Sequence, residues 1–320
     1  MSEAQPINAT TIARALDQIS AELRSSPQFL HEALSRRLGR PVVVKVETVN
    51  PLGSFKGRGA WLAVGGLAGD GRLTPEREVV AASSGNFGLA VAYAARAFEV
   101  PAVIFAAQAA NLRKVERIRG LGARVELTGH DFDAAREASQ EHAQRGGGLL
   151  LVDAEEPRIT IGAGTIGVEL SAAVERDELP AIGTAFVPVG NGALIVGVGC
   201  WLRHASPPTR VVGVQAAGAP SMTLSWRAGR PIETEAADTY AGGIATRVPV
   251  PEALELMKDV VDEMLLFSDD ELREAQRELT EALGITVEGS AAASWAAARV
   301  APAGQGAALV LVTGANAELD

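Results

Sequence analysis

The sequence has little of what a disulfide-bonded, membrane-spanning or exported protein requires. Cys200 is the only cysteine among the 320 residues, so no disulfide framework can form within the chain, and a reducing compartment is indicated. No uninterrupted apolar run has the length that crosses a bilayer. The first ten residues lack a basic stretch followed by an apolar core, and we therefore expect no secretory signal and a cytoplasmic location.

The chain also has no excess of basic over acidic residues. The chain has 29 Lys and Arg against 39 Asp and Glu, and its net charge of -10 at pH 7 disfavours a nucleic-acid-binding surface. Aromatic residues make up only 4% of the chain, whereas 47% of the residues are hydrophobic. This length and composition suffice for one large or two modest domains. We expect a globular protein whose partner is a small molecule, not nucleic acid or a membrane.

Short apolar runs alternate with helical patterns along the chain. Nine runs are predicted strands, namely Val42–Val46, Val79–Ala82, Ala102–Ala106, Arg124–Leu127, 149–152, 185–189, 210–214, 264–267 and 308–312. Predicted helices lie between them at 88–98, 112–121, 132–145, 192–203 and Asp269–Leu283. Ser268 and Glu271 have the spacing of a capping box, which specifies the start of the last helix.

This alternation is typical of βαβ units, which form mostly parallel sheets. Nine strands are many for one compact sheet, so the pattern favours two α/β domains with a cleft between them. Three helix–strand repeats between Val79 and Asp153 indicate a small domain inserted into a larger one. We therefore predict a small, mobile domain of residues 78–154 and a discontinuous large domain of residues 1–77 and 155–320.

The segment after the first predicted strand holds a single lysine among turn residues. Pro51 indicates a turn, and Gly57 and Gly59 allow another group to approach the backbone closely. Phe55 directly precedes Lys56. In a closed site, an apolar neighbour disfavours the charged form of a lysine, so its amine becomes nucleophilic. This is the requirement for a lysine that forms a Schiff base.

Two further segments join a predicted strand to a helix through turn residues. The first is Ser83, Ser84, Gly85, Asn86 and Phe87, and the second is Gly190, Asn191, Gly192, Ala193 and Leu194. Free backbone N–H groups and the helix dipole suit the first turn to a carboxylate and the second to a phosphate. The second turn lacks the Gly-Lys-Ser/Thr ending of a nucleoside-triphosphate loop, which favours a monoester phosphate.

Residues 162–167 satisfy the G-x-G-x-x-G pattern of dinucleotide-binding folds. The pattern begins about ten residues after the nearest predicted strand, although a dinucleotide site follows its strand directly. A nicotinamide-dependent oxidoreductase is therefore a distant alternative. The four histidines and Cys200 are scattered, with neither the spacing of metal ligands nor that of a catalytic triad.

Taken in order, eight segments resemble the fold type II family of pyridoxal-phosphate enzymes, in particular the branch of threonine/serine dehydratases and serine racemases. They are residues 53–60 (GSFKGRGA), 83–86 (SSGN), 129–134 (GHDFDA), 162–167 (GAGTIG), 188–194 (PVGNGAL), 243–245 (GIA), 287–292 (VEGSAA) and 313–316 (TGAN). The resemblance extends over nearly the whole chain from residue 42 onward. It implies a fold like that of the tryptophan synthase beta subunit, with two three-layer α/β/α domains and a cofactor cleft between them.

The resemblance implies pyridoxal 5'-phosphate as the cofactor and a role for each matching residue. Lys56 would hold the cofactor as a Schiff base and then remove the proton from the substrate Cα. The other implied cofactor contacts are Phe55 near the ring, Asn86 at the phenolic oxygen, Gly190, Asn191, Gly192, Ala193 and Leu194 around the phosphate, Glu288, and Thr313 at the pyridine nitrogen. The implied substrate contacts are Ser83, Ser84, Gly85, Asn86 and Phe87, where the turn would hold the carboxylate.

The implied activity is a lyase reaction of amino-acid metabolism, carried out by a homodimer. Water would be eliminated from a small β-hydroxy amino acid such as threonine or serine, giving a 2-oxo acid and ammonia. The neutral hydroxyl of Thr313 would leave the pyridine nitrogen unprotonated, which favours β-elimination over transamination. Ser84 keeps an amino-acid racemase open, because a serine there is the second acid/base of the racemase subgroup. A β- or γ-replacement enzyme, cysteine synthase-like or threonine synthase-like, is also open.

Three departures from the family pattern concern the cavity and its ligands. Phe87 stands where dehydratases usually carry histidine, so the pocket wall is more apolar than usual. Asn191 and Ala193 stand in the phosphate loop where four glycines are common, and this crowds the loop. Gln215 and Ser221 stand where the branch has the carboxylates of a divalent-cation site, and we therefore expect no metal there.

Overall fold

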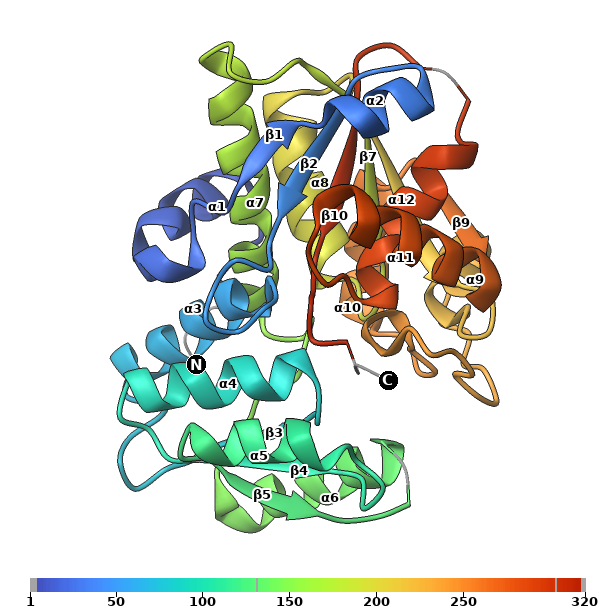
Figure 1. The fold of residues 1–320 in the computed structure, drawn as a ribbon. Helices are drawn as coiled ribbons and strands as arrows, with labels where there is room; N and C mark the ends of the chain where they lie inside the picture. Colours follow the sequence, from blue (N-terminus) through green and yellow to red (C-terminus); the bar gives the residue numbers. More distant parts are fainter. Residues whose placement is uncertain (1–4, 131, 303, 318–320) are drawn as a thin grey trace.

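The structure is a computed structural model that describes residues 5–130, 132–302 and 304–317. Within these residues, ten strands form two separate sheets, and helices pack on both faces of each sheet (Figure 1). This arrangement confirms the predicted α/β fold with two three-layer units. No helix in the described part of the chain is both long enough and apolar enough to cross a membrane.

The larger sheet has six strands in the order β1-β2-β10-β7-β8-β9. Their bounds are β1 Gln28–Leu30, β2 Val42–Val46, β7 Ile182–Pro188, β8 Arg210–Ala216, β9 Glu263–Phe267 and β10 Ala307–Val312. The edge strand β1 is antiparallel to its neighbour, and the remaining pairs of this sheet are parallel. The inner strands are buried on both faces, as their continuous apolar runs predict.

Successive residues of β10 belong to two different cores. Ala307, Leu309 and Leu311 pack on the face covered by α7 (Pro157–Glu175), α8 (Ala193–Ala205) and α10 (Pro251–Val260). Ala308, Val310 and Val312 pack on the opposite face, which is covered by α2 (Glu32–Leu38), α11 (Asp269–Leu283) and α12 (Gly289–Val300). The alternation follows from the two-residue period of a strand.

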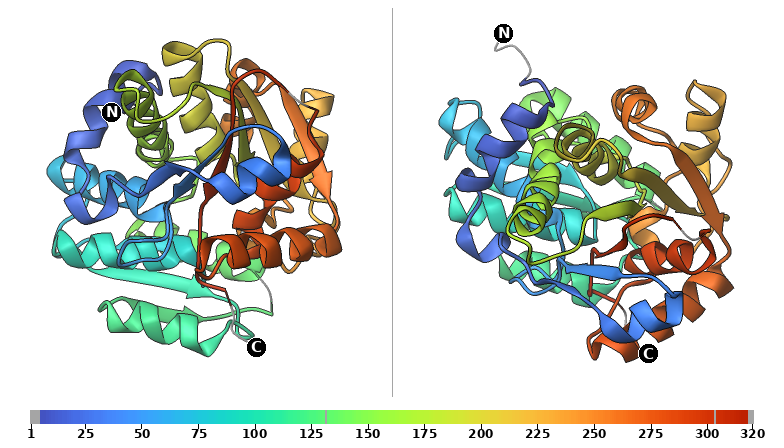
Figure 2. Two further views of the ribbon diagram at one scale, coloured as in Figure 1. Left: turned by 45° about the horizontal axis from the view of Figure 1, so that its top comes forward. Right: turned by 90° about the horizontal axis from the view of Figure 1, so that it is seen from above.

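The smaller sheet has four parallel strands in the order β5-β4-β3-β6. Their bounds are β3 Val79–Ala82, β4 Ala102–Ala106, β5 Arg124–Leu127 and β6 Leu149–Leu150. One face is covered by α4 (Asn86–Ala97) and α5 (Leu112–Gly120), and the other face by α6 (Phe132–His142). Figure 2 shows this unit in cyan and green beside the larger sheet.

Helix α3 (Lys56–Gly69) connects the two units. It packs against α4 of the smaller unit and against α7 of the larger one, and the apolar core is continuous across this contact. The remaining helices are α1 (Ala9–Ala15) and α9 (Ser221–Ala228), with short helical turns at Leu16–Gln18, Ala21–Leu23, Ala143–Gly147 and Gly242–Ile244. The cleft between the sheets is therefore bordered by a helix that both units share.

The predicted elements agree with the structure in most places. The capping box at Ser268 and Glu271 is confirmed, and it starts α11 as predicted. The predicted strand 149–152 pairs only over Leu149–Leu150, because the chain then turns into the connection to the larger sheet. The sequence analysis did not find β1, which is too short and too exposed to give an apolar pattern. The predicted domain boundaries at 78 and 154 stay a prediction.

Candidate active site

A cavity of about 1510 Å³ lies between the two sheets. It is lined by residues that directly follow β3, β6, β7 and β10, and ligands of open α/β sheets bind at such carboxyl ends of strands. Every residue that the sequence predicted for the site lines this cavity, namely Phe55, Lys56, Ser83, Ser84, Gly85, Asn86, Phe87, Gly190, Asn191, Gly192, Ala193, Leu194, Glu288 and Thr313. Their individual roles stay predictions.

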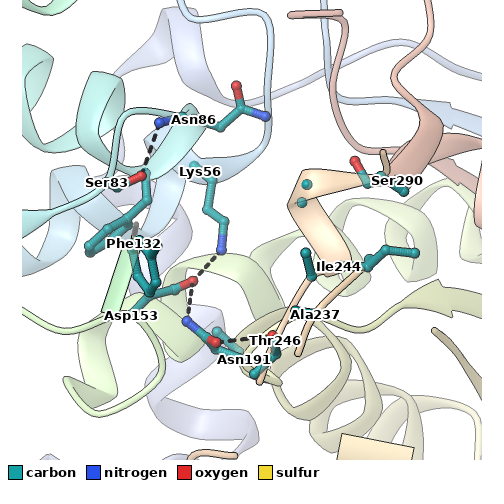
Figure 3. Close-up of a pocket in the computed structure, with 18 of the residues that line it drawn as sticks. Lys56, Ser83, Asn86, Phe132, Asp153, Asn191, Ala237, Ile244, Thr246 and Ser290 are labelled. Atoms are coloured by element: carbon teal, nitrogen blue, oxygen red, sulfur yellow. Dashed lines mark hydrogen bonds and ion pairs between the residues drawn. The ribbon is translucent and has the colours of Figure 1, made fainter. Parts of the chain in front are cut away.

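Lys56 is the first residue of α3, and its side chain points into the cavity (Figure 3). The turn before Lys56 was predicted from the sequence, whereas the start of a helix at the lysine was not. Its Nζ lies 4.9 Å from the centroid of the Phe55 ring and 6.0 Å from that of Phe87. The same Nζ lies 2.6 Å from Oδ2 of Asp153. The amine is therefore held between two aromatic rings and one carboxylate.

The glycines after the lysine let α3 approach its neighbours. A Cβ on Gly57 would come within 2.7 Å of the Leu52 side chain. A Cβ on Gly59 would lie 2.6 Å from the carbonyl oxygen of Ile159 in α7. The group that approaches the backbone closely at Gly59, as predicted, is thus the neighbouring helix α7. Because neither position can hold a larger residue without a shift, the two glycines fix the place of Lys56.

A buried group of charged side chains lies next to the start of α3, which we call the Arg58 cluster: Lys45, Glu47, Arg58 and Glu169. The guanidinium donates to both carboxylates at distances of 2.8–3.0 Å. Lys45 Nζ also contacts the Glu169 carboxylate. Arg58 lies two residues after Lys56 in α3, and its ion pairs connect this helix to the end of β2 and to α7. The cluster therefore fixes the position of the helix that carries the amine.

The charged groups of the Arg58 cluster shift one another's pKa values. Burial alone raises the pKa of Glu169, but hydrogen bonding and the charge of Arg58, with a contribution from Lys45, lower it to about 2. Burial lowers the pKa of Lys45, and the nearby Glu47 and Glu169 carboxylates offset this only in part. Breaking one bond of such a buried network leaves another charge uncompensated.

The turn between β3 and α4 has the geometry of an anion site. The hydroxyl of Ser83 accepts a hydrogen bond of 3.1 Å from the backbone N–H of Gly85. A Cβ on Gly88 would lie 2.0 Å from the Ser83 carbonyl oxygen, so this tight turn requires glycine there. The next backbone N–H groups, at Asn86 and Phe87, belong to the first turn of α4, where no helical partner exists.

Asn86 takes part in a network that crosses the cleft. Its Nδ2 donates to both carboxylate oxygens of Glu288 at 3.0 Å, and its Oδ1 accepts from Asn316 Nδ2 at 2.7 Å. The backbone N–H of Asn316 also donates to Glu288, and the side-chain Oδ1 of Asn316 accepts from Arg117 Nη1 at 2.6 Å. Both oxygens belong to one carboxylate, so one hydrogen of the Asn86 amide can be shared between them and the second can bind a ligand.

The turn between β7 and α8 is built around two glycines. A Cβ on Gly190 would lie 2.7 Å from the carbonyl oxygen of Gly243, and Gly192 has a φ of 102°, which favours glycine. Gly192 precedes α8 without a side-chain cap, so the first N–H groups of the helix face the cavity side. The Asn191 amide contacts Asp153 and Thr246 (Figure 3).

The remaining predicted positions are also placed. Thr313 directly follows β10 and is almost fully buried, and its carbonyl oxygen accepts from the Phe55 N–H at 3.1 Å. Gln215 and Ser221 make hydrogen bonds within the protein: the Gln215 amide oxygen accepts from Thr223, and the Ser221 hydroxyl donates to the Thr246 carbonyl. The absence of a metal there stays a prediction.

Residues 162–167, which gave the dinucleotide pattern, lie inside α7 and not at its start. A Cβ on Gly162 would come within 2.7 Å of Gly59, and one on Gly164 would lie 2.9 Å from the Gly197 carbonyl oxygen. These glycines therefore allow α7 to pack closely on α3 and α8. Helix-interior N–H groups bond within the helix, so this segment offers no phosphate site.

Asp153, Thr246 and Asn316 are among the polar residues of the cavity that were not predicted from the sequence. Asp153 had a usable signal, because it follows a predicted strand of a parallel sheet, where functional side chains gather. Asn316 was quoted as part of a motif without a role. Thr246 lies in an irregular segment and gave no signal. Of the quoted motif 129–134, residue 131 lies outside the described residues.

The site fits an aldehyde that carries a phosphate group. The α8 turn offers N–H donors in a cradle that a side chain at Gly190 would fill. Lys56 offers an amine, and Asp153 Oδ1 is buried with no hydrogen-bond partner among the described residues. A model of the family described as pyridoxal-phosphate dependent enzyme matches residues 19–314. The chain belongs to this family.

Family membership confirms the predicted family and cofactor. Among its relatives, the L-threonine ammonia-lyase of Thermotoga maritima is 38% identical over 264 residues, which are 82% of this chain and 64% of that protein. The L-threonine ammonia-lyase of Geobacter sulfurreducens is 32% identical over 288 residues, which are 90% of this chain and 70% of that protein. The chain thus spans somewhat less than two thirds of the first of these relatives.

A solved structure of this pyridoxal-phosphate family shares the fold. The structure of maize serine racemase superposes with a TM-score of 0.89 at 25% identity, covering 98% of this chain and 95% of that one. This agrees with the predicted branch of dehydratases and racemases, and with the predicted fold type II architecture.

Proposed function

We propose that this chain is a pyridoxal-phosphate-dependent ammonia-lyase that eliminates water from a small β-hydroxy amino acid such as threonine or serine. The products would be a 2-oxo acid and ammonia. The observation that carries the proposal is the amine of Lys56, which points into a cavity bordered by two separate turns, each leading into the start of a helix. Such helix starts favour anions. An amino acid has one anionic group and the cofactor another, so the two turns match the two ligands. The ammonia-lyase names of the two relatives support the same reaction.

The residues of this chain would divide the work as follows. When bound, pyridoxal phosphate supplies an electron sink for the pair released at the substrate Cα. Residues 190–194 hold the phosphate with the N–H groups at the start of α8. The N–H groups of Asn86 and Phe87 bind the substrate carboxylate, which orients the Cα–H bond toward Lys56. Lys56 Nζ then accepts the Cα proton, with the Phe55 and Phe87 rings excluding water around it.

Two further roles complete the proposed site. Thr313 would place a neutral hydroxyl at the pyridine nitrogen, and Glu288 would orient Asn86 so that its free N–H hydrogen faces the cofactor oxygen. Ser84 lines the cavity on the same turn and would bind the substrate carboxylate. If it instead acts as an acid on the face opposite Lys56, the enzyme also racemises its substrate.

The test uses the purified, cofactor-loaded protein. We expect a yellow protein whose Lys56 becomes covalently labelled on borohydride reduction, and which releases 2-oxo acid from serine and threonine. Chiral chromatography of the remaining substrate measures racemisation, and added thiols or amines measure replacement of the leaving group. A colourless, borohydride-inert protein would exclude the role of Lys56. Replacement or racemisation without oxo-acid release would exclude the lyase in favour of that reaction.

We also propose a homodimer in the cytoplasm, with residues 78–154 as a small domain that moves against the rest. A single cysteine suits a reducing compartment. The contacts from Asn86 to Glu288 and from Arg117 to Asn316 join the two units across the cleft, so they would break when it opens. Sedimentation would give the assembly state, and small-angle scattering with and without substrate would detect closure.

A further inference from the structure

Asp153 lies in the cavity but has no part in the mechanism above. Its Oδ2 accepts a 2.6 Å hydrogen bond from Lys56 Nζ and a longer one, of 3.4 Å, from Asn191 Nδ2. Its Oδ1 is buried and has no partner among the described residues. A buried carboxyl oxygen without a partner costs free energy, and such a group in a native site calls for a ligand or a chemical role.

The position of Asp153 relative to Lys56 defines what it can reach. The proposed function, on which this inference rests, requires Lys56 Nζ to approach the substrate Cα within proton-transfer distance, about 3 Å. The Asp153 carboxyl lies 2.6 Å from the same nitrogen. Cβ is one bond from Cα, so the carboxyl is within reach of the group that leaves Cβ.

A hydroxyl group leaves carbon readily only when it receives a proton. Lys56 is engaged in removing the Cα proton, and a serine hydroxyl such as that of Ser84 is a much weaker acid than a carboxyl group. We propose that Asp153 is the acid that protonates the leaving hydroxyl of the substrate. The acid would let the enzyme use amino acids whose β-substituent, such as a hydroxyl, needs a proton to depart.

The surroundings of Asp153 favour this use. Lys56 Nζ and the Asp153 carboxyl are in contact at 2.6 Å, so a proton can pass directly between them. Asn191 joins the carboxyl to the turn proposed to hold the phosphate. The proposed step starts with the shared proton on Asp153 and with the Lys56 amine neutral, so that each group has the form that its role requires.

The step balances without any further reactant. The Cα–H bond breaks and its proton goes to Lys56 Nζ, while Cα and Cβ become joined by a double bond. The Cβ–O bond breaks with its electron pair on oxygen, and the Asp153 O–H proton goes to that oxygen, so water leaves. The proton on Lys56 then passes to the Asp153 carboxylate across their contact, which restores both groups.

The leaving group provides the test. Asp153→Asn keeps the size of the side chain but has no acidic proton, so kcat on serine should fall about 100- to 1,000-fold. Chloride leaves without a proton, so kcat on 3-chloroalanine should fall less than about threefold. Glu155→Gln removes the neighbouring carboxyl that lines the same cavity and should change both rates less than about twofold. Asp153→Glu, which keeps an acid, should recover part of the serine rate.

Two readouts other than turnover accompany the rates. The Asp153→Asn protein should bind the cofactor with the wild-type absorbance and be labelled at Lys56 by borohydride. In deuterated water, NMR should show that it still exchanges the Cα proton of serine, because removal of that proton does not need the acid. Asp153→Ala should give the same pattern and serves in its place if the Asn variant does not fold.

Equal losses on serine and 3-chloroalanine, or no loss on either, would overturn the proposal. An equal loss would mean that Asp153 acts only by positioning Lys56. Failure of the proposed function is a separate outcome, because it would be seen in the wild-type protein as no oxo acid from serine or threonine. A wild-type enzyme active on serine, with an unchanged ratio of rates in Asp153→Asn, would exclude only the acid.

Discussion

Replacing Arg58 with methionine perturbs the cluster that holds the start of α3. Arg58 is fully buried and forms paired hydrogen bonds to Glu47 and Glu169, both of which are also buried. The substitution keeps most of the side-chain volume but leaves two carboxylates with Lys45 as the remaining cation of the cluster. Removing one partner of a buried ion pair typically costs about 3–5 kcal/mol, and we expect a loss in this range.

The lowered pKa of Glu169 points in the same direction. Its ordinary value is 4.5 and its value in the folded protein is about 2, a difference that corresponds to about 3 kcal/mol. Since the folded pKa lies below the unfolded one, this stability is present above pH 4.5 and is lost as the pH falls toward 2. In Arg58→Met the acid sensitivity of stability over this window should therefore be smaller.

Urea unfolding of the cofactor-free protein, followed by circular dichroism at pH 7 and pH 3, measures both effects. Arg36→Met is the matched control, because the Arg36–Glu32 pair is exposed on α2 and should contribute less than about 1 kcal/mol. A loss below about 1 kcal/mol for Arg58→Met, similar to that of the control, would refute the reasoning. It would mean that the buried carboxylates find other partners or take up protons at little cost.

Three further outcomes follow from the site. Lys56→Ala should give a colourless protein after cofactor addition and abolish turnover, because the variant has no amine at the start of α3. An absorbance spectrum and an oxo-acid assay check this. Dialysis against a chelator should leave the rate unchanged, because Gln215 and Ser221 bring no carboxylate, and activation by magnesium or calcium would contradict this. Serine or threonine should outcompete 3-hydroxyaspartate in a side-by-side assay of oxo-acid release, because Phe87 offers no partner to a second charge. Phe87→His should make the preference for serine over 3-hydroxyaspartate about tenfold smaller, and a wild-type preference for 3-hydroxyaspartate would show that Phe87 does not face the substrate.

Much of the fold was predictable because its strands are continuous apolar runs. The interior strands β2, β3 and β4 start and end where the sequence predicts. The edge strand β5 does so too, although its residues alternate between charged and apolar. Continuous apolar runs are recognisable since parallel strands are buried on both faces. The edge strand β1 has only three residues, two of them exposed, so no periodicity could reveal it. Its pairing depends on a tertiary contact with β2 that local sequence does not encode.

The candidate site was predictable where a turn and a helix start coincide, as at residues 83–87 and 190–194. Glycine and short polar residues at such junctions have a local physical reason that a sequence displays. The partner of Lys56 was not predictable in this way. Asp153 is 97 residues away along the chain, and the contact exists only because β6 ends opposite the start of α3. The same holds for Asn316, which meets Asn86 across 230 residues.

The alternation along β10 has a consequence for the chemistry of the cavity. If β10 shifted by one residue, each of its side chains would move from one core to the other. The packing of both cores therefore opposes such a shift in register. Thr313 is the next residue after the strand, and its height above the sheet is set by the same register. The depth at which its hydroxyl would meet a ligand is therefore determined by six buried aliphatic side chains, none of which lines the cavity.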